Sequence, residues 1–564
     1  MLSYRLFRTP LFYSVVWLSL FTVVACRNRE KPKPPKEVVM VEKPEEVQVK
    51  ASEQMQELLR FVEGSDGKMN DSTQLRNYNL LRSIYSETGY EPIWSSVDKW
   101  KPTADSLFFL ISKCREFALF PSDYHLPQLL RERNNLVIDT AARKNIALWT
   151  RSDILLTDGF LQMLRDVYTG RLDKDSITQR YDTLSNEQRI TYLKQVNSAG
   201  GGYAVLESLE PKLTGYQAIR AALPAFLDSV TFKDYTYVKY PAKDSMTLVR
   251  TVAKRLQEDS LLSANWTDAD SSGYAEAVKK YQAANKIKTT GIAASLTVQS
   301  MNSTTWDKFK RIAVNLDRYK QLPATMPPTY IWVNLPAFSL KVMDADTVAL
   351  ASKVIVGAPK TRTPVLSSQV VNFITSPQWT VPYSIIFKEM LPKIQKDINY
   401  LNKQNLMVVD KNDSVINPAT IDWSKLSKTN FPYLLRQRQG DDNSLGVMKF
   451  NFRNKYDVYL HDTNARGLFA RSNRAMSHGC VRVQEWSKLS QFLVRDDTIK
   501  YPVDTLKAWI SRQEKHVIAD FDHVPVYLRY FTVDASDGRI KFYDDIYGDD
   551  RLLTERYFKS KLIH

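Results

Sequence analysis

The spacing of hydrophobic positions along the chain predicts where helices give way to strands. From residue 52 to residue 239 apolar residues recur at about every third or fourth position, most clearly over 147–164, which predicts amphipathic helices. The same spacing returns over 246–302. We therefore predict a helical scaffold domain over 52–239 and a compact helical module over 246–302.

Short runs of β-branched and aromatic residues replace the helical pattern after residue 328. Glycine or proline bounds several of these runs, as is typical of strands; they are 330–335, 352–356, 370–375, 447–452 and 458–460. A strand over 524–533, a turn at 536–538 and a strand over 540–543 predict a closing hairpin. We predict a mostly β domain over 328–548, with a helical capping insertion at 385–434 and a C-terminal tail at 549–564. The predicted fold class is multidomain α+β.

The first fifty residues follow neither pattern. Arg5 and Arg8 precede an uncharged apolar stretch that ends at Ala25, which is typical of a secretory signal over 1–25. The stretch is short for a membrane-spanning helix of about 20 residues, and an uncleaved anchor helix is the alternative. Residues 26–50 are rich in Lys, Glu, Pro and Val, a composition that predicts a flexible tether.

Composition and charge narrow the range of partners. The chain has 564 residues, of which 43% are hydrophobic, so it is long enough for several packed domains. Its 78 Lys and Arg against 62 Asp and Glu give a formal net charge of +16. A basic surface suits an anionic partner, and it is equally expected of a solvated surface without a specific partner. No zinc-finger spacing or basic block indicates nucleic acid, so we expect no nucleic-acid partner.

The three cysteines, Cys26, Cys114 and Cys480, lie far apart and are odd in number, which argues against a disulfide framework. Cys114 lies among apolar residues and is predicted to be a buried structural thiol. Two of the six histidines, His461 and His478, fall within twenty residues of Cys480. A thiol is only a few per cent ionised at neutral pH and becomes a working nucleophile when a histidine lies within reach.

Residues near Cys480 have further features of an acyl-transfer site. His461 ends a predicted strand, and the loop after it is long enough to return Cys480 to the same place. Gly479 permits a tight turn that points backbone amides at an oxyanion. Arg482 supplies a fixed positive charge that could hold a carboxylate. Two alternatives stay open: a buried thiol beside two hydrogen-bonded histidines, and a zinc site, which lacks a fourth ligand at useful spacing.

The spacing of these residues resembles the signature of L,D-transpeptidases with a YkuD-type catalytic domain. The resemblance consists of His461, fifteen intervening residues, and the run Ser477, His478, Gly479, Cys480, Val481 and Arg482. Further stretches resemble the YcbB-like subgroup of this family: 91–94, 121–125, 377–382, 436–437, Gly440 and 443–446. Together the resemblance covers nearly everything after about residue 75.

The resemblance implies a role for each site residue. Cys480 would be the nucleophile and His461 the general base and acid. Backbone amides around His478 to Cys480 would form the oxyanion hole, with Ser477 and Gly479 in support. His478 itself could orient the loop, touch substrate or serve as the base in place of His461. Substrate contacts are expected from Arg482 and Tyr459.

Two weaker resemblances concern the segments before and after the predicted scaffold domain. Residues 23–26 resemble a lipobox, which implies cleavage before Cys26, lipidation of its sulfur and a membrane anchor on the periplasmic side of the cell envelope. In the module, Tyr281 and Gln282 belong to a pattern that resembles small peptidoglycan-binding modules. A helical spacer is the alternative interpretation of the module.

The family resemblance also implies the reaction. The donor would be a peptidoglycan stem tetrapeptide, which forms a thioester with Cys480, releases D-alanine and is cross-linked to the amine of a neighbouring stem. No metal or organic cofactor is expected, and carbapenems would acylate Cys480. Alternatives with the same residues are an L,D-carboxypeptidase and a protein-to-peptidoglycan ligase. The non-enzymatic alternative is a wall-binding scaffold lipoprotein.

Overall fold

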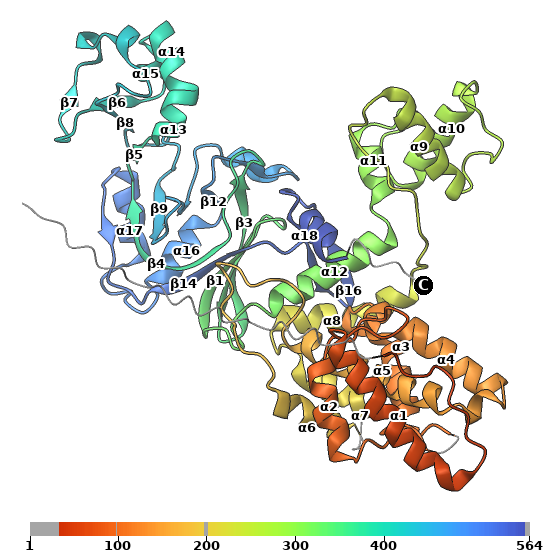
Figure 1. Cartoon of the computed structure of the whole chain (residues 1–564). Coiled ribbons are helices and arrows are strands. Elements are labelled where there is room, and N and C mark those ends of the chain that lie inside the picture. The colour runs from red at the N-terminus through yellow and green to blue at the C-terminus, as the bar shows by residue number, and fades with distance from the viewer. Residues whose placement is uncertain (1–32, 97–98, 197–200, 559–564) are drawn as a thin grey trace, which may run out of the picture.

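The computed structural model of the protein describes residues 33–96, 99–196 and 201–558. A helical N-terminal region and a mostly β C-terminal region form its two large parts, which confirms the predicted α+β class in outline (Figure 1). The predicted signal segment and Cys26 lie outside the described residues. Among the helices that the structure describes, none combines the length and apolarity needed to cross a membrane.

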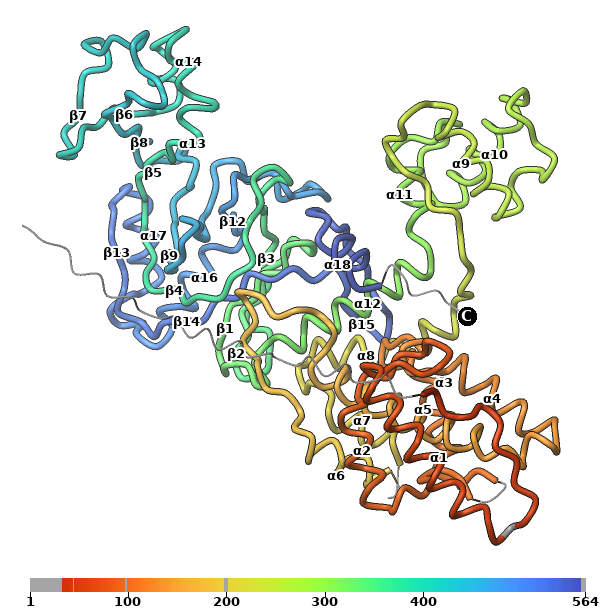
Figure 2. Tube along the Cα trace, viewed as in Figure 1, coloured from red at the N-terminus to blue at the C-terminus, as the bar shows by residue number. Residues whose placement is uncertain are grey.

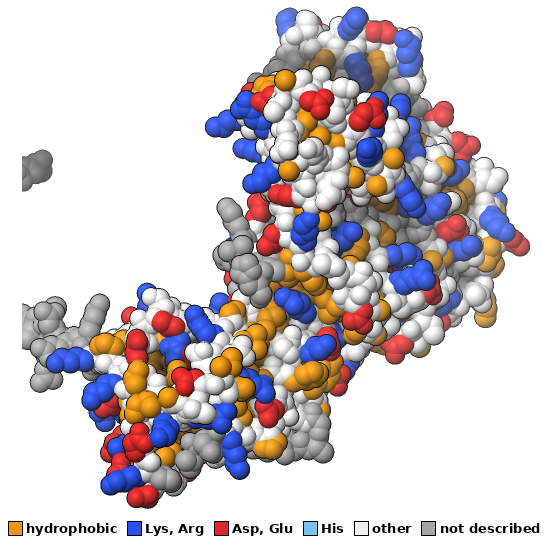
Figure 3. Space-filling view, turned by 90° about the vertical axis from the view of Figure 1, so that its right-hand side faces the viewer, with side chains coloured by type: hydrophobic (Ala, Val, Ile, Leu, Met, Phe, Trp, Pro, Cys, Tyr) orange, Lys and Arg blue, Asp and Glu red, His pale blue; other side chains and the backbone are white. Residues whose placement is uncertain are grey.

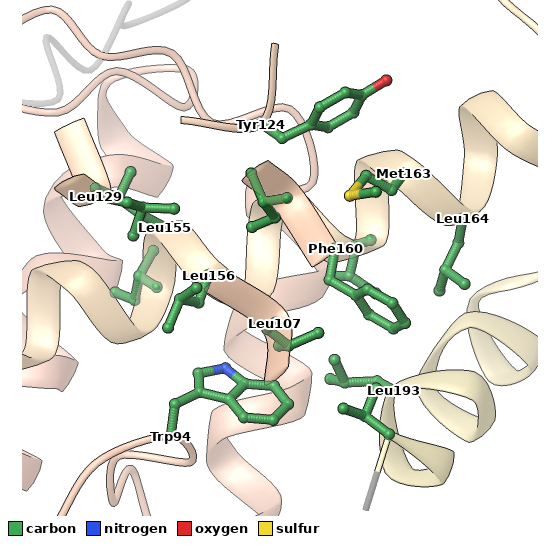
Figure 4. Close-up of a cluster of buried hydrophobic side chains, with 14 of the residues drawn as sticks. Trp94, Leu107, Tyr124, Leu129, Leu155, Leu156, Phe160, Met163, Leu164 and Leu193 are labelled. Carbon is green, nitrogen blue, oxygen red and sulfur yellow. The ribbon is translucent and has the colours of Figure 1, made fainter. Parts of the chain in front are cut away.

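The helical region is built around one central helix. This helix, α5 (Ile146–Tyr168), is buried along most of its length, and Asn145 caps it by accepting a hydrogen bond from the Ala147 amide. Figure 4 shows Phe160 and Leu156 of α5 packed among side chains of the surrounding segments. The other helices here are α1 (Pro44–Gly64), α2 (Tyr78–Glu87), α3 (Pro102–Ser112), α4 (Leu126–Ile138), α6 (Asn186–Gln195), α7 (Gly201–Leu209) and α8 (Thr214–Asp228).

Two buried carboxylates of α5 anchor the loops that contain the subgroup motifs at 91–94 and 121–125. Asp158, which is fully buried, accepts hydrogen bonds from the amide of Asn77 at 2.7 Å and from His125 Nε2 at 2.7 Å. Asp153 accepts from the amides of Ile93 and Trp94 at 2.9 and 2.8 Å. Burial raises the pKa of Asp153 to about 6, against the opposing effect of these donors. The motifs at 91–94 and 121–125 therefore fasten loops to the central helix.

The tether predicted over 26–50 is wrong for its described part. Helix α1 begins at Pro44, and Val41 before it is only 5% exposed. Met40 forms an isolated β-bridge with Asn145, and the Val39 amide donates to Asn145 Oδ1 at 2.9 Å. Val39, Val41 and Val47 pack with Ile146 at the start of α5. The charged average composition of the segment therefore did not indicate that it packs against the scaffold.

The module consists of three helices with a hydrophobic core of their own, α9 (Ser245–Glu258), α10 (Ser271–Ala284) and α11 (Ser295–Asn302). Gln282 is 1% exposed. Its Oε1 accepts from the amides of Thr290 and Gly291 at 2.8 and 3.0 Å, and its Nε2 donates to Thr297 Oγ1 at 2.9 Å. Gln282, which belongs to the pattern that resembles peptidoglycan-binding modules, therefore holds the connection between α10 and α11 in place.

A sheet closed on itself forms the C-terminal region. The strands follow the order β3-β12-β10-β9-β4-β14-β1-β2, and β2 pairs with β3 to close the ring. Strands β11 (Ala475–Ser477) and β13 (Val517–Ile518) attach to β3 and β4. The ring strands are β1 (Thr329–Asn334), β2 (Ser339–Asp344), β3 (Thr347–Gly357), β4 (Leu366–Thr375), β9 (Met448–Phe452), β10 (Leu460–His461), β12 (Val481–Val483) and β14 (Val524–Arg529). Helices α16 (Trp486–Leu493) and α17 (Val503–Ser511) contribute leucines to its core.

The insertion is not purely helical, which corrects the sequence prediction over 385–434. It is a small subdomain, called here the cap, that runs from Trp379 to Gln437 and has its own apolar core. A sheet in the order β5-β8-β6-β7 supports its helices, and β5 and β8 lie where the cap joins the body (Figure 2). Its elements are β5 (Trp379–Thr380), α13 (Tyr383–Ile385), a π-helical turn (Ile386–Met390), α14 (Leu391–Lys396), α15 (Tyr400–Lys403), β6 (Leu406–Val409), β7 (Val415–Ile416) and β8 (Leu434–Gln437).

The C-terminal segments also differ from the prediction. The strand expected over 524–533 is two strands in different sheets, because β14 enters the ring whereas β15 (Val533–Ser536) pairs with β16 (Arg539–Phe542). The expected turn is present between β15 and β16. The tail predicted over 549–564 includes helix α18 (Asp549–Phe558), which packs against α12 (Thr305–Tyr319). Buried Asp550 fixes α18 through hydrogen bonds from Asn315, Arg318 and Thr532.

The net positive charge is dispersed over the face that Figure 3 presents. Lys and Arg side chains on this face are interspersed with Asp and Glu side chains and do not gather into one patch. Over the described residues many exposed Lys and Arg side chains are paired with Asp or Glu, as Arg133 is with Asp105 and Lys194 with Glu87. Exposed pairs of this kind keep a surface soluble and contribute little to stability.

Candidate active site

Three neighbouring strands bring His461, Arg482 and Lys449 side by side. His461 of β10 is paired with Lys449 of antiparallel β9 and with Arg482 of parallel β12. Directly paired residues of adjacent strands point to the same face of a sheet. All three side chains consequently line one cleft on this face.

Cys480 joins this group from the residue before β12. The Val481 amide donates to the Tyr459 carbonyl at 3.1 Å, so Cys480 lies beside Tyr459, two positions from the His461–Arg482 pair. Residues 480 and 482 share a face by the alternation of a strand. The thiol donates to the backbone carbonyl of Asp457, at 3.9 Å between Sγ and O. Within the described residues no hydrogen bond joins Cys480 to His461, although both line the same cleft.

His461 is 4% exposed and neutral at ordinary pH. Burial lowers its pKa to about 3, with help from the positive charge of Arg482 and against the hydrogen-bonding backbone of Asp462 and Leu445. Its Nδ1 is buried without a hydrogen-bond partner among the described residues. A neutral imidazole with an unused nitrogen is chemically able to take a proton.

The Cys480 thiol is protonated in the resting site. Burial raises its pKa, and it outweighs hydrogen bonds from Tyr459 and the charges of Lys449 and Arg482, which act in the opposite direction. Lys449 Nζ lies 4.1 Å from the centroid of the Tyr459 ring. Tyr459, expected from the resemblance to contact substrate, thus also contacts the thiol. Activation of the thiol requires a base rather than spontaneous ionisation.

A tight turn presents the thiol. Gly479 has φ +124°, a backbone conformation that favours glycine. Its amide donates to Ser477 Oγ at 3.1 Å, and Ser477 Oγ donates to the Cys480 carbonyl at 2.6 Å. Because the Gly479 amide is already engaged, an oxyanion hole in this loop would use the amides of His478 and Cys480 instead.

Two threonines that the sequence did not single out clamp this turn. Thr361 Oγ1 donates to the Ser477 carbonyl at 2.8 Å, and Thr363 Oγ1 donates to the Gly479 carbonyl at 2.8 Å. Thr363 Oγ1 also accepts from the Gly357 amide at 2.8 Å. A Cβ on Gly357 would lie 2.1 Å from the Thr361 carbonyl oxygen, so this approach needs glycine. Nothing in the local sequence pattern marks either threonine.

The motif at 443–446 supports His461 from behind. Asn443 Oδ1 accepts from the Leu445 amide at 2.8 Å, which shapes the turn whose backbone faces the imidazole. Gly446 has φ +60°, and a Cβ there would lie 2.2 Å from Asp462 Oδ2. Asp462, buried next to His461, accepts from Arg466 Nη2 at 2.6 Å. The motif therefore orients the histidine and leaves the chemistry to other residues.

The cleft above these residues, called here the Cys480 cleft, has a volume of about 970 Å³. Strands β9, β10 and β12 supply one wall, and the cap supplies the other. Of the described residues that line it, four are Lys or Arg and two are acidic, namely Lys388, Lys449, Arg453, Arg482, Glu389 and Asp457. Arg482 Nε is buried without a partner in the part of the chain that the structure describes. An unpaired guanidinium beside the thiol suits a substrate that carries a carboxylate.

His478, whose role the sequence left open, points to the cap. Its Nε2 lies 2.8 Å from Glu389 Oε1 in the π-helical turn, and both side chains are about half exposed. His461 and His478 thus have different environments, one buried beside Arg482 and one at the cap. Cys114, by contrast, is fully buried in the scaffold core, where burial raises its pKa. Over the described ranges no group of three or more His, Cys, Asp or Glu side chains is arranged to hold a metal.

Comparison with known proteins agrees with these observations. The family model of the L,D-transpeptidase catalytic domain, YkuD, matches residues 328–501, and that of a Scaffold domain matches residues 79–223. A Haemophilus influenzae protein with the provisional name L,D-transpeptidase is 37% identical over 246 residues, which are 43% of this chain. The chain spans about half the length of that relative, 49%.

Solved structures show only a distant likeness. The NMR structure of the catalytic domain of an E. faecium L,D-transpeptidase acylated by ertapenem is 13% identical, covering 36% of this chain and 99% of that one, with a TM-score of 0.17. The carbamoyl enzyme of Ldtfm with avibactam is also 13% identical, covering 40% of this chain and 63% of that one, with the same TM-score. With TM-scores this low, the family is indicated by the match over residues 328–501 and by the 37% identical relative, and not by these structures. Residues 328–501 are an L,D-transpeptidase catalytic domain of the YkuD family.

Proposed function

We propose that the protein is a cysteine L,D-transpeptidase that cross-links peptidoglycan through a thioester on Cys480. The observation that carries this proposal is the placement of Cys480, His461 and Arg482 on one face of adjoining strands, at the floor of a cleft. The thiol is the nucleophile, the neutral histidine is a base, and the unpaired guanidinium attracts an anionic donor. Each group matches a need of acyl transfer to and from a stem peptide.

The first half-reaction uses the neutral state of His461. As the sulfur attacks the carbonyl of the third stem residue, the thiol proton passes to the imidazole. The resulting imidazolium is buried beside Arg482 and is a strong acid, because the same environment that lowers its pKa to about 3 disfavours its charge. It therefore gives the proton readily to the departing amine of D-alanine. The amides of His478 and Cys480 would stabilise the oxyanion.

Defined muropeptides test this function. Purified protein incubated with a tetrapeptide-stem donor and an amine-bearing stem should release D-alanine and yield a cross-linked product of the expected mass. Cys480→Ala should release none. Release of D-alanine without cross-linking, even at high acceptor concentration, would identify a carboxypeptidase. No release under any condition would refute the proposal.

We further propose that the protein is an exported lipoprotein on the periplasmic side of the cell envelope, anchored through Cys26. The support is the signal-like segment before Cys26 and the stretch 23–26, which resembles a lipobox. Cys26→Ser should remove labelled lipid from the protein in cells. Equal lipid incorporation in the mutant and the natural protein would contradict the anchor. The module over 246–302 is proposed to bind the wall polymer, and deletion of it should then weaken cosedimentation of the protein with sacculi.

A further inference from the structure

We propose that Glu389 and His478 form the acceptor side of the Cys480 cleft, where the carboxylate attracts the incoming amine and the histidine takes its proton. This inference rests on the proposed transpeptidase function and extends it to the second half-reaction. An acceptor amine is a cation at neutral pH, with an ordinary pKa of about 10.4 for a lysine-like group. The positively charged acceptor needs a negatively charged contact, whereas the floor of the cleft is positively charged.

The distribution of charge over the cleft selects Glu389 for this role. Only two acidic residues line the cleft among the residues described, Glu389 on the cap and Asp457 on the opposite wall. The backbone carbonyl of Asp457 already accepts from the Cys480 thiol, on the strand side. Glu389 lies on the cap side of the cleft and contacts His478, which is two positions before the nucleophile in the sequence. The cap therefore brings a half-exposed negative charge into the Cys480 cleft, next to His478.

The hydrogen bond between the two side chains leaves useful atoms free. His478 Nε2 is bonded to Glu389 Oε1 at 2.8 Å. A carboxylate at that distance favours the tautomer with the proton on Nε2, which makes Nδ1 the basic nitrogen. Glu389 Oε2 has no protein partner in the described part of the chain, so it is available to an ammonium group. One pair thus offers an anionic contact and a base.

The position of Glu389 depends on an irregular helix. It lies in the π-helical turn Ile386–Met390, immediately before α14, whose second residue is Pro392. Proline lacks the amide that an α-helix needs at this point, and a wider π turn accommodates the missing hydrogen bond. The turn also places Lys388 in the cleft wall next to Glu389. Lys396 of α14 is exposed and does not line the cleft, so it can serve as a control that also removes one charge from the cap.

The proposed step is balanced in atoms and charge. The ammonium bound at Glu389 first loses one proton to solvent by way of His478 Nδ1. The resulting uncharged amine attacks the thioester carbonyl, forming a C–N bond and a zwitterionic tetrahedral adduct. The adduct passes one N–H proton to His478 Nδ1, and the imidazolium is stabilised by Glu389. Collapse of the adduct breaks the C–S bond and leaves the amide product and the Cys480 thiolate. His478, half exposed, returns its proton to solvent.

The test separates the two half-reactions in the full chain. Glu389→Gln and His478→Gln are compared with Lys396→Gln, using a tetrapeptide-stem donor and a stem acceptor. D-alanine release measures acylation, and the ratio of cross-linked to hydrolysed donor measures transfer. We expect acylation within about twofold of the natural protein in Glu389→Gln, and a transfer ratio at least about tenfold lower, with a raised KM for the acceptor. Lys396→Gln, which changes a residue outside the cleft, should keep the natural ratio.

Hydroxylamine distinguishes a chemical role from a structural one. It is uncharged at neutral pH and its adduct loses a proton easily, so it needs neither the carboxylate nor the base. Glu389→Gln should therefore regain transfer when hydroxylamine replaces the stem amine. An equal loss with both acceptors, an equal loss in Lys396→Gln, or acylation that falls in parallel would overturn the inference. Failure of the natural protein to release D-alanine would instead refute the proposed function itself.

Discussion

His461 lies directly opposite Arg482 on the parallel strands β10 and β12, and this pairing sets a fixed positive charge beside a buried imidazole. The same register puts Lys449 on the other side of His461. Burial and these cations all favour the neutral ring, and the pKa of His461 falls to about 3. A base at the floor of this cleft is thereby ready over the whole ordinary pH range.

The pH dependence of acylation follows from that pairing. Below its pKa of about 3 His461 is protonated and inactive as a base, and above it His461 is active. The acylation rate should therefore be flat between about pH 5 and pH 8, without the step near 6.5 that an ordinary histidine gives. Stopped-flow acylation by a carbapenem measures this rate. Arg482→Gln should move the acidic limb to higher pH. An acidic limb centred near 6.5 in the natural protein would contradict the assignment.

Removal of the thiol should abolish the chemistry and spare the fold. Cys480→Ala deletes one atom at the edge of a cleft, so thermal unfolding should change little, whereas turnover should fall below about a thousandth. Cys480→Ser should be nearly as inactive, because a hydroxyl ionises far less readily. After carbapenem treatment, intact-mass spectrometry should show one adduct in the natural protein, located on the peptide with Cys480. An unchanged adduct in Cys480→Ala would locate the nucleophile elsewhere.

The clamp on the catalytic turn gives a third prediction. Thr363→Val keeps the shape of the side chain but removes the hydroxyl that joins Gly357 and Gly479. Two buried backbone groups lose their partner, which should cost about 2 kcal/mol of stability and lower kcat more than it raises KM. Thr363→Ser retains the hydroxyl and should recover most of both. Denaturant unfolding and acylation kinetics measure the two effects. Equal behaviour of the valine and serine variants would show that the hydroxyl does not hold the turn.

In the scaffold, Asp158 should be far more costly to remove than an exposed aspartate. Asp158→Ala leaves the amide of Asn77 and the ring of His125 without their acceptor in a fully buried place. The free energy of unfolding should fall by about 3 kcal/mol or more. Asp105→Ala, which breaks only the exposed pair with Arg133, should change it by less than about 1 kcal/mol. Chemical denaturation compares the two, and similar losses would refute the anchoring role of Asp158.

Sequence patterns predicted most of the helices and strands but not how strands close into a ring. The spacing of apolar residues located α5 and the strands near β1, β3, β4 and β9, because burial of one face imposes that spacing. The single run over 524–533 concealed a change from one sheet to another, since strand propensity does not specify a partner. The prediction of a flexible tether failed for a related reason. The Val41 amide donates to the carbonyl of Lys144, and average composition does not report a contact with so distant a segment.

For the candidate site, the reactive residues could be predicted from the sequence, whereas the residues that hold and surround them could not. Cys480, His461 and Arg482 stood out because their residue types are rare together at that spacing. Thr361 and Thr363 did not stand out, because each hydroxyl acts by donating a hydrogen bond to a backbone carbonyl that is far away in the sequence. The pairing of His478 with Glu389 crosses 89 residues and two subdomains, so no local pattern could indicate it.

Strand β14 is the last of the ring strands to be synthesised, and the ring stays open until it is in place. It lies between β4 and β1, and its register with β1 pairs Ile331 with Val526 across nearly 200 residues. A growing chain that has not yet reached residue 529 leaves both neighbours with unsatisfied edges. Contacts between such distant segments slow the search for the native pairing. Cys480 is therefore synthesised before β14, the strand that completes the ring. A truncated chain that lacks β14 would contain Cys480 without a complete site.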